Sequence, residues 1–203
     1  MPAAKTLFFD IGGVLLTNAW DTPTRKRAAE TFGLEYPEFQ TRHEMLKTAF
    51  ETGRLTLDAY VQKAVFHRAR SFTPADFKKF MFDQSQTIGE TLEWVRALAR
   101  AGHCRLFTLN NESKELHEHR VKEFQLDTIF RGFLTSCYLG QAKPDEGIYL
   151  SSLGIAACEG AHALFIDDRA LNIEPALALG LDAVLFEGLD SLREILKDRG
   201  IVV

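Results

Sequence analysis

The chain has 203 residues, of which 46% are hydrophobic and 26% are charged, and its formal net charge is -4. This length allows one sizeable hydrophobic core, or one core with a small insertion, and the composition is that of a folded globular protein rather than a disordered chain. The mild acidity offers no basic surface for a nucleic acid, so we expect no nucleic-acid partner.

The cysteines and the N-terminal residues indicate the cellular compartment of the protein. Cys104, Cys137 and Cys158 are odd in number and lack the spacing of a metal site, which is typical of a reducing environment, and we expect them to be structural. The opening MPAAK is too short for a signal peptide, and the apolar run that follows contains an aspartate and two glycines. We therefore expect a cytoplasmic protein with no membrane partner.

Five short apolar segments predict buried strands. They are KTLFFD (5–10), CRLFTLN (104–110), FRGFLTS (130–136), HALFID (162–167) and DAVLF (182–186). Amphipathic segments between them predict helices over 90–102, 113–124, 144–154 and 173–180, with Gly102, Gly154 and Gly180 as the stops. This alternation indicates an α/β fold, a doubly wound, Rossmann-like parallel sheet with helices on both faces.

The region from about residue 22 to residue 82 has a different pattern. Helical periodicity runs through 22–33, 36–53, 55–69 and 73–82, with Thr56 and Thr73 as expected N-caps and no convincing strand. We therefore predict a core domain from 1–16 and 86–203, with a small all-helical cap domain at 17–85. An insertion after the first strand would cover the crevice in which open α/β sheets bind ligands.

Two predicted strands end in carboxylates, at Asp10 and at the pair Asp167 and Asp168. If these strands are neighbours in a parallel sheet, the three side chains meet at one edge, where their mutual repulsion favours a raised pKa or a bound cation. A hard ion with oxygen ligands, such as Mg²⁺, suits this set. Lys143, which precedes a proline and the next helix, would place a positive charge beside the cluster, where it can stabilise an anionic substrate.

Four stretches together resemble the haloacid dehalogenase-like superfamily: FFDIGGVL, the NN after the second strand, GQAKPDEGIYLSSLG and FIDDRALNIEPALALG. The resemblance runs from about Lys5 to Phe186. It is closest to subclass I, the phosphatase-type members with a helical C1-type cap after the first strand. The last two stretches are the most specific, because Lys-Pro-Asp and Asp-Asp-x-x-x-Asn rarely occur by chance in this order and spacing.

The resemblance implies an aspartyl-phosphate mechanism. Asp10 would be the nucleophile, and Lys143 would stabilise both Asp10 and the transferring phosphoryl group. Mg²⁺ would be held by Asp10, the Gly12 carbonyl and Asp168, with Asp167 reaching it through water. Gly12 and Gly13 would let the backbone approach the phosphate, while Asn110 and Asn111 would donate hydrogen bonds to it.

The sequence departs from the family pattern at two positions. These phosphatases usually carry a second aspartate two residues after the nucleophile, as general acid and base, and this chain has Gly12 there. Losing a positioned acid or base typically costs about 10²- to 10⁴-fold in rate, so activity should favour anomeric sugar, acyl or aryl phosphates over simple alkyl esters.

The second departure lies directly before Asn110, where the family has a serine or threonine and this chain has Leu109. Thr108 is one residue early, and strand alternation turns it to the opposite face unless the strand bulges.

Other residues have simpler interpretations. In the cap, Trp20, Arg42 and His43 are candidate substrate contacts, although helix packing and surface charge would also account for them. The segment His117–Arg120 lacks a metal-binding spacing, and we expect it to be a solvated helix face. Asn172 is expected to orient the acidic loop.

The leading functional hypothesis is a Mg²⁺-dependent phosphatase of small phosphorylated metabolites. The alternative is a catalytically weak or silent relative that binds a phosphorylated ligand or a protein partner, which Gly12 and Leu109 favour. A metal-free 2-haloacid dehalogenase is the third hypothesis, and Asp167 and Asp168 oppose it because extra carboxylates without a metal would repel an anionic haloacid.

Overall fold

The computed structural model describes residues 6–202 and is built on one parallel sheet. Its strands are β1 (Thr6–Phe9), β2 (Arg105–Asn110), β3 (Gly132–Thr135), β4 (Ala163–Asp167) and β5 (Asp182–Leu185). The order is β3-β2-β1-β4-β5, so the chain reverses its direction of winding between β1 and β4. The five predicted strands are confirmed, although Lys5 lies outside the described residues. In sheets of this kind, ligands bind at the carboxyl ends of the strands where the winding reverses.

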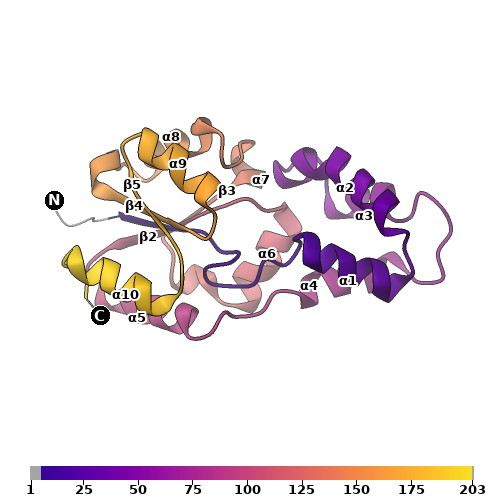
Figure 1. The fold of residues 1–203 in the computed structure, drawn as a ribbon, viewed down its shortest axis with the longest axis horizontal. Coiled ribbons are helices and arrows are strands. Elements are labelled where there is room, and N and C mark those ends of the chain that lie inside the picture. Colours follow the sequence, from indigo (N-terminus) through magenta and orange to yellow (C-terminus); the bar gives the residue numbers. More distant parts are fainter. Residues whose placement is uncertain (1–5, 203) are drawn as a thin grey trace.

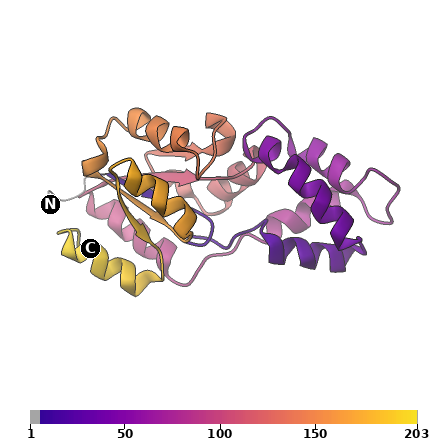
Figure 2. The ribbon, with the colours of Figure 1, turned by 45° about the horizontal axis from the view of Figure 1, so that its top comes forward.

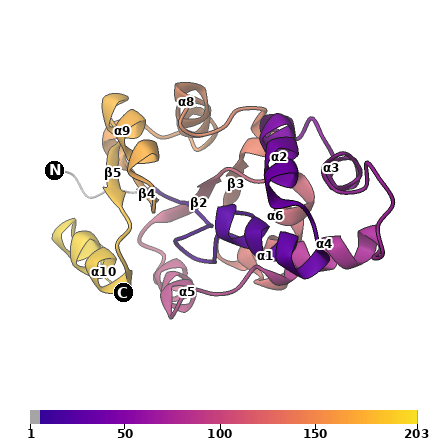
Figure 3. The ribbon, with the colours of Figure 1, turned by 45° about the vertical axis from the view of Figure 1, so that its right-hand side comes forward.

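Helices cover both faces of the sheet, as Figure 3 shows. One face packs against α5 (Thr91–Ala101) and α10 (Leu189–Asp198), and the other against α8 (Glu146–Ile155) and α9 (Ala170–Ala178). All four residues of β1 are fully buried, because this central strand is covered on both sides. The α/β prediction is confirmed. The helix α10 was not predicted, although Leu192 and Leu196 recur there at helical spacing and are buried.

The predicted helix ends are right at Gly102 and wrong at Gly154. Gly102 ends α5 in the left-handed conformation. The helix α8 runs through Gly154 to Ile155, because Ala156 packs into the core and its N–H group closes the last turn on Ser152. The helix α9 begins at Ala170, before its predicted start, and Gly180 follows its end with a φ of 80°.

Four helices follow β1 and form a separate body at one end of the molecule, visible in Figures 1 and 2. They are α1 (Thr22–Phe32), α2 (Tyr36–Glu51), α3 (Leu57–Ala64) and α4 (Pro74–Asp83). Thr56 and Thr73 cap α3 and α4 as predicted. Their shared core is rich in aromatic side chains and includes Phe39, Tyr60 and Phe77.

Two chain segments connect this helical body to the sheet, and they pair with each other. Leu16 and Thr87 form an antiparallel bridge, and the Thr17 N–H group donates to the Gln86 carbonyl at 2.8 Å. The buried Arg120 of α6 (Lys114–Glu123) donates to the Thr17 carbonyl at 2.8 Å and to the Ser85 hydroxyl at 3.1 Å. The division into a core and a cap at 17–85 remains a proposal, and its boundaries fall beside this pairing.

The remaining elements are short: α7 (Ser136–Leu139) and two 3-10 turns, Leu126–Thr128 and Gly160–His162. Within residues 6–202, no helix combines the length and the apolar character needed to cross a bilayer.

Candidate active site

The carboxylates that follow β1 and β4 meet at one point, as the sequence predicts. The two strands are parallel neighbours, with Phe9 level with Ile166, and the Asp10 N–H group donates to the Ile166 carbonyl at 2.9 Å. Asp10, Asp167 and Asp168 each place an oxygen within 4.8 Å of the others. Gly13, with a φ of 77°, packs so closely that a Cβ there would lie 1.9 Å from Asp168 Oδ2. Only glycine fits between the loop and this cluster.

Lys143 lies among the carboxylates, with its side chain 1% exposed. Its Nζ is 2.6 Å from Asp167 Oδ2 and 3.3 Å from Asp10 Oδ1, and it donates to the Leu109 carbonyl at 2.8 Å. The Asn111 side chain holds the Lys143 backbone through two hydrogen bonds of 2.8 Å. This amide is therefore committed to positioning the lysine.

Burial raises the pKa of Asp10 to about 7; Lys143 opposes the increase, and Asp167 and Asp168 add to it. The Asp10 Oδ1 atom also accepts a hydrogen bond from the Ile11 N–H group at 2.7 Å. Among residues 6–202, no group donates to Oδ2. One oxygen of Asp10 is thus held in place while the other is available for chemistry.

Asp167 and Asp168 differ in how their oxygens are occupied. Asp167 accepts from Lys143, from the Arg169 N–H group at 2.9 Å and from Asn172 Nδ2, which is 3.0 Å from both oxygens. Asn172 therefore orients the acidic loop, as expected.

Asp168 Oδ2 accepts from Asn18 Nδ2 at 3.2 Å, whereas Asp168 Oδ1 is buried without a hydrogen-bond donor in the described part of the chain. The nearest cationic atom to Oδ1 is Arg169 Nε at 4.0 Å. An orphaned carboxylate oxygen beside two further carboxylates fits a hard divalent cation.

Three buried donors on β2 and at the start of its following helix have no partner among the described residues, and two of them, on Asn110 and Ser113, line the pocket; the third is the Thr108 hydroxyl. The Asn110 side chain accepts from the Thr135 hydroxyl at 3.0 Å, but its Nδ2 is buried without an acceptor among the described residues. Ser113 precedes α6, and its Oγ is also buried and unpartnered. Both residues line the main pocket, where such donors suit an anionic group.

The two departures from the family pattern have structural explanations. At Gly12, a Cβ would lie 2.6 Å from Asn18 Oδ1, so the Asn18 side chain already fills that space. The strand β2 pairs regularly through Thr108 and Leu109 without a bulge. Leu109 packs in the core, and the buried Thr108 is not among the pocket residues. Thr108 therefore does not replace the missing hydroxyl.

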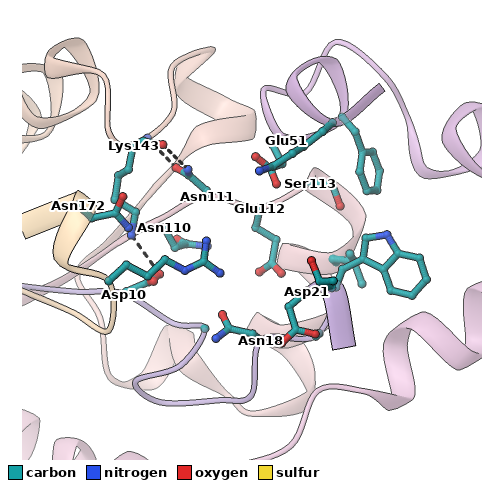
Figure 4. Close-up of a pocket in the computed structure, with 18 of the residues that line it drawn as sticks. Asp10, Asn18, Asp21, Glu51, Asn110, Asn111, Glu112, Ser113, Lys143 and Asn172 are labelled. Carbon is teal, nitrogen blue, oxygen red and sulfur yellow. Dashed lines mark hydrogen bonds and ion pairs between the residues drawn. The ribbon is translucent and has the colours of Figure 1, made fainter. Parts of the chain in front are cut away.

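The pocket has a volume of about 510 Å³ and is lined from both bodies, as Figure 4 shows. We name its core wall Asp10, Asn110, Lys143 and Asn172, and its cap wall Trp20, Arg25, His43, Lys47 and Glu51. Gly12, Asn18 and Asn111 also line it, whereas Gly13 faces a different cavity.

Part of the cap wall is a buried hydrogen-bonded chain. Trp20 Nε1 donates to the Tyr60 hydroxyl at 2.9 Å, and this hydroxyl lies 2.9 Å from His43 Nδ1. Burial, with Arg25 and Lys47 nearby, lowers the pKa of His43 to about 3. His43 is therefore neutral, and its Nδ1 shares a hydrogen bond with the tyrosine hydroxyl.

Three carboxylates that line the pocket, Asp21, Glu51 and Glu112, were not predicted, and burial shifts the pKa of the two glutamates. Burial raises the pKa of Glu112, against the effect of Arg120, whose Nη1 is 3.2 Å from it. Burial also raises the pKa of Glu51, with Lys47 and Arg169 opposing the shift. Neither residue belongs to a recognisable motif. The NNES stretch, which places Glu112 after a strand end, could have indicated that residue, whereas no local signal marks Glu51.

Two expectations about surface residues are wrong. His117 and Arg120 are 2% and 3% exposed, not solvated, because α6 packs between the sheet and the helical body. Arg42 does not line the pocket; it pairs with Glu38 at 3.3 Å on the outer side of α2.

Comparisons with known proteins agree with this geometry. A family model described as haloacid dehalogenase-like hydrolase matches residues 4–180. Flavin mononucleotide hydrolase 1 of Arabidopsis thaliana is 27% identical over 196 residues, which cover 94% of this chain and 78% of the plant protein. Bifunctional epoxide hydrolase 2 of Sus scrofa is 34% identical over 218 residues; the match covers 98% of this chain but only 39% of the pig protein.

A solved structure has the same fold. The enzyme is from Bacteroides thetaiotaomicron and was crystallised with magnesium and inorganic phosphate. It superposes with a TM-score of 0.76 at 19% identity, covering 93% of this chain and 98% of the bacterial enzyme.

Proposed function

Because the chain belongs to the haloacid dehalogenase-like hydrolase family, we propose that it is a Mg²⁺-dependent phosphatase of a small phosphorylated metabolite. The observation that carries the proposal is the position of Lys143 Nζ, 3.3 Å from Asp10 and 2.6 Å from Asp167, beside the orphaned Oδ1 of Asp168. This is a carboxylate nucleophile with a fixed cation next to it and an oxygen free for a metal.

In the proposed reaction, Asp10 Oδ2 attacks the phosphorus and the bond from phosphorus to the ester oxygen breaks, so that an aspartyl phosphate forms and the substrate oxygen leaves with the electron pair and takes a proton from water. Lys143 and Asn110 Nδ2 stabilise the phosphoryl oxygens, and the Ser113 hydroxyl offers the donor that Leu109 lacks. Water then cleaves the intermediate and releases inorganic phosphate. Mg²⁺, held by Asp10, Asp168 and the Gly12 carbonyl, with Asp167 reaching it through water, would neutralise the charge of the carboxylates and the phosphoryl group.

The cap wall supports a substrate larger than phosphate itself. Its Trp20 ring and the neighbouring Phe50 offer apolar surface, and Lys47 and Glu51 offer charges of both signs. The similarity to a flavin mononucleotide hydrolase makes flavin mononucleotide the first substrate to test.

The test measures phosphate release by the purified protein, with Mg²⁺ and with EDTA. The substrates are p-nitrophenyl phosphate, flavin mononucleotide, an anomeric sugar phosphate, an acyl phosphate and a simple alkyl phosphate. We expect Mg²⁺-dependent turnover that falls at least about 10⁴-fold in Asp10→Asn. Asp145→Asn is the matched control, because this exposed carboxylate makes no side-chain hydrogen bond at the start of α8.

The outcomes separate the competing functions. Phosphate binding without turnover would indicate a silent binding protein, and release of chloride from 2-chloropropionate in EDTA would indicate a dehalogenase. Either result would contradict the proposal. The relative rates of the substrates test the effect of Gly12. If no acid protonates the leaving oxygen, aryl, acyl and anomeric phosphates should be hydrolysed faster than the simple alkyl phosphate. Rapid hydrolysis of flavin mononucleotide, whose leaving group is an alcohol, would instead indicate an acid elsewhere, and Glu51 and Glu112 are then the residues to replace.

A further inference from the structure

The loop after β1 turns back on itself and brings Asn18 to Gly12. Gly12 and Leu16 form a parallel bridge, and the Gly13 N–H group donates to the Leu16 carbonyl at 2.7 Å. The Leu15 and Leu16 N–H groups both donate to the Ile11 carbonyl, at 3.0 Å and 2.9 Å. These bonds hold the loop in one shape.

Gly12 is required by space and not by backbone conformation. Its φ lies outside the left-handed region, so other residues could adopt this backbone. A Cβ, however, would lie 2.6 Å from Asn18 Oδ1 and 3.5 Å from Asn18 Cγ. The carboxamide of Asn18 therefore occupies the volume into which a side chain at position 12 would extend.

The same carboxamide holds one metal-site carboxylate. Asn18 Nδ2 donates to Asp168 Oδ2 at 3.2 Å, while Asp168 Oδ1 keeps no hydrogen bond among residues 6–202. A donor on one oxygen restricts rotation of the carboxylate. The Asp168 carboxylate is thereby held in the cluster in which it, Asp10 and Asp167 each place an oxygen within 4.8 Å of the others. Partners of this kind orient metal ligands, and losing them typically weakens metal binding.

We propose that Asn18 is a positioning residue for Asp168, and that Gly12 and Asn18 are a coupled pair in which the absence of one side chain makes room for the other. A neutral carboxamide, which orients a ligand but transfers no proton, takes the space of the carboxylate that other phosphatases of this kind carry at position 12. The inference rests on the proposed function, because it assigns Asp168 to a cation.

The first experiment measures Mg²⁺ binding by calorimetry, without substrate, in the wild type, Asn18→Ala and Asn18→Leu. Leucine keeps the branched shape of the asparagine side chain but is bulkier and has no donor, whereas alanine removes the donor without adding bulk. We expect both variants to bind Mg²⁺ about 10-fold or more weakly. Gln86→Ala is the control, because that exposed amide donates to the Asp83 carbonyl and does not line the pocket. Wild-type affinity in both Asn18 variants would overturn the proposal.

A double-mutant cycle tests the coupling. Gly12→Ala should weaken Mg²⁺ binding as Asn18→Ala does, because its Cβ displaces the carboxamide. In the Asn18→Ala background, where that contact no longer exists, Gly12→Ala should add less than about a twofold effect. Additive effects of the two substitutions on Mg²⁺ affinity would mean that Gly12 and Asn18 act independently, and would contradict the proposed coupling. Because Gly12→Ala leaves Asn18 intact, it also keeps the proposal testable if Asn18→Ala fails to fold.

Kinetics provide an independent readout. With Asn18→Ala we expect a lower kcat that is restored by raising Mg²⁺, and an unchanged KM at saturating metal. A loss that Mg²⁺ does not restore would indicate a general structural role and would contradict the proposal. Failure of the proposed function is a different result: the wild type itself would then release no phosphate from any substrate, whatever the effect of Asn18 on Mg²⁺ binding.

Discussion

The core wall and the cap wall of the pocket hold their charged side chains in different ways. On the core wall, Lys143 contacts Asp10, Asp167 and the Leu109 carbonyl, and it is almost completely buried. On the cap wall, the buried Arg25 is also held, because it donates to Gln40 at 2.9 Å and to Thr22 at 3.0 Å. The side chains of Lys47 and Glu51, in contrast, make no hydrogen bond or ion pair within the described residues. A reacting group gains from being held in one geometry, whereas groups that contact the variable part of a substrate can remain uncommitted until it binds. This difference supports the proposal that the core wall carries the chemistry and that Lys47 and Glu51 contribute to recognition.

The largest effect is expected on the core wall, for Lys143→Met. Removing the cation leaves Asp10 and Asp167 buried together without compensation, which should lower the free energy of unfolding by about 3–5 kcal/mol. Urea unfolding without metal measures this loss, and Mg²⁺ should recover part of it. Lys114→Met is the control, because Lys114 is exposed and lies 3.9 Å from Glu118, where an ion pair contributes little. Equal stability of the two variants would contradict a tightly held core wall.

A smaller loss is expected at the junction between the walls, for Arg120→Met. This change leaves Glu112 buried without its partner and removes donors from Ser85 and Thr17. Because burial already raises the pKa of Glu112, this carboxyl can take up a proton, and we expect a loss of about 2–3 kcal/mol in urea unfolding. The double variant Arg120→Met with Glu112→Leu should be more stable than Arg120→Met alone. A double variant that is less stable would mean that the ion pair itself is not the source of the effect.

On the cap wall, His43 makes stability depend on pH. Its pKa is lowered from 6.5 to about 3, so below pH 6.5 the unfolded chain binds a proton that the folded chain does not. The contribution of His43 to the free energy of unfolding is complete above pH 6.5 and decreases as the pH falls. At pH 5 the loss is about 2 kcal/mol.

The His43→Gln variant should therefore show a flatter dependence of unfolding free energy on pH between about pH 6.5 and pH 4. The exposed His103 provides the control, since His103→Gln should leave the dependence as in the wild type. An unchanged slope in His43→Gln would show that this imidazole is not held neutral.

The smallest effect compares two cations of α2. Lys47 lines the pocket, whereas Arg42 pairs with Glu38 outside it. With the best substrate, we expect Lys47→Ala to raise KM by about 3- to 10-fold, as for the loss of one exposed charged contact of about 1 kcal/mol. Arg42→Ala should leave KM within about twofold. Steady-state kinetics at saturating Mg²⁺ measures both effects. An equal rise in KM for the two variants would contradict the prediction that Lys47 contacts the substrate and Arg42 does not.

The groups of the core wall were predictable because each follows from a local pattern. An apolar strand that ends in aspartate, and a lysine before proline at the start of a helix, both place charge at the carboxyl edge of a parallel sheet. The wall opposite was only partly predictable. Trp20 and His43 line the pocket, but Arg42, nearby on the same helix as His43, does not, because the rotation of α2 is set by the aromatic core that it shares with α3 and α4.

The sequence by itself determined the strands, the helical insertion and the candidates Asp10, Asp167, Asp168 and Lys143, because periodicity and strand ends are local properties of the chain. The meeting of these four side chains depends on the strand order, which places β1 beside β4. Only the tertiary structure explains why residue 12 is a glycine. The loop after β1 folds back and places the Asn18 side chain in the space that a larger residue at position 12 would need. It also decided that His117 and Arg120 are buried and that Ser113 places an unpartnered hydroxyl in the pocket. These features depend on which surfaces pack together, and packing between distant segments leaves no period in the sequence.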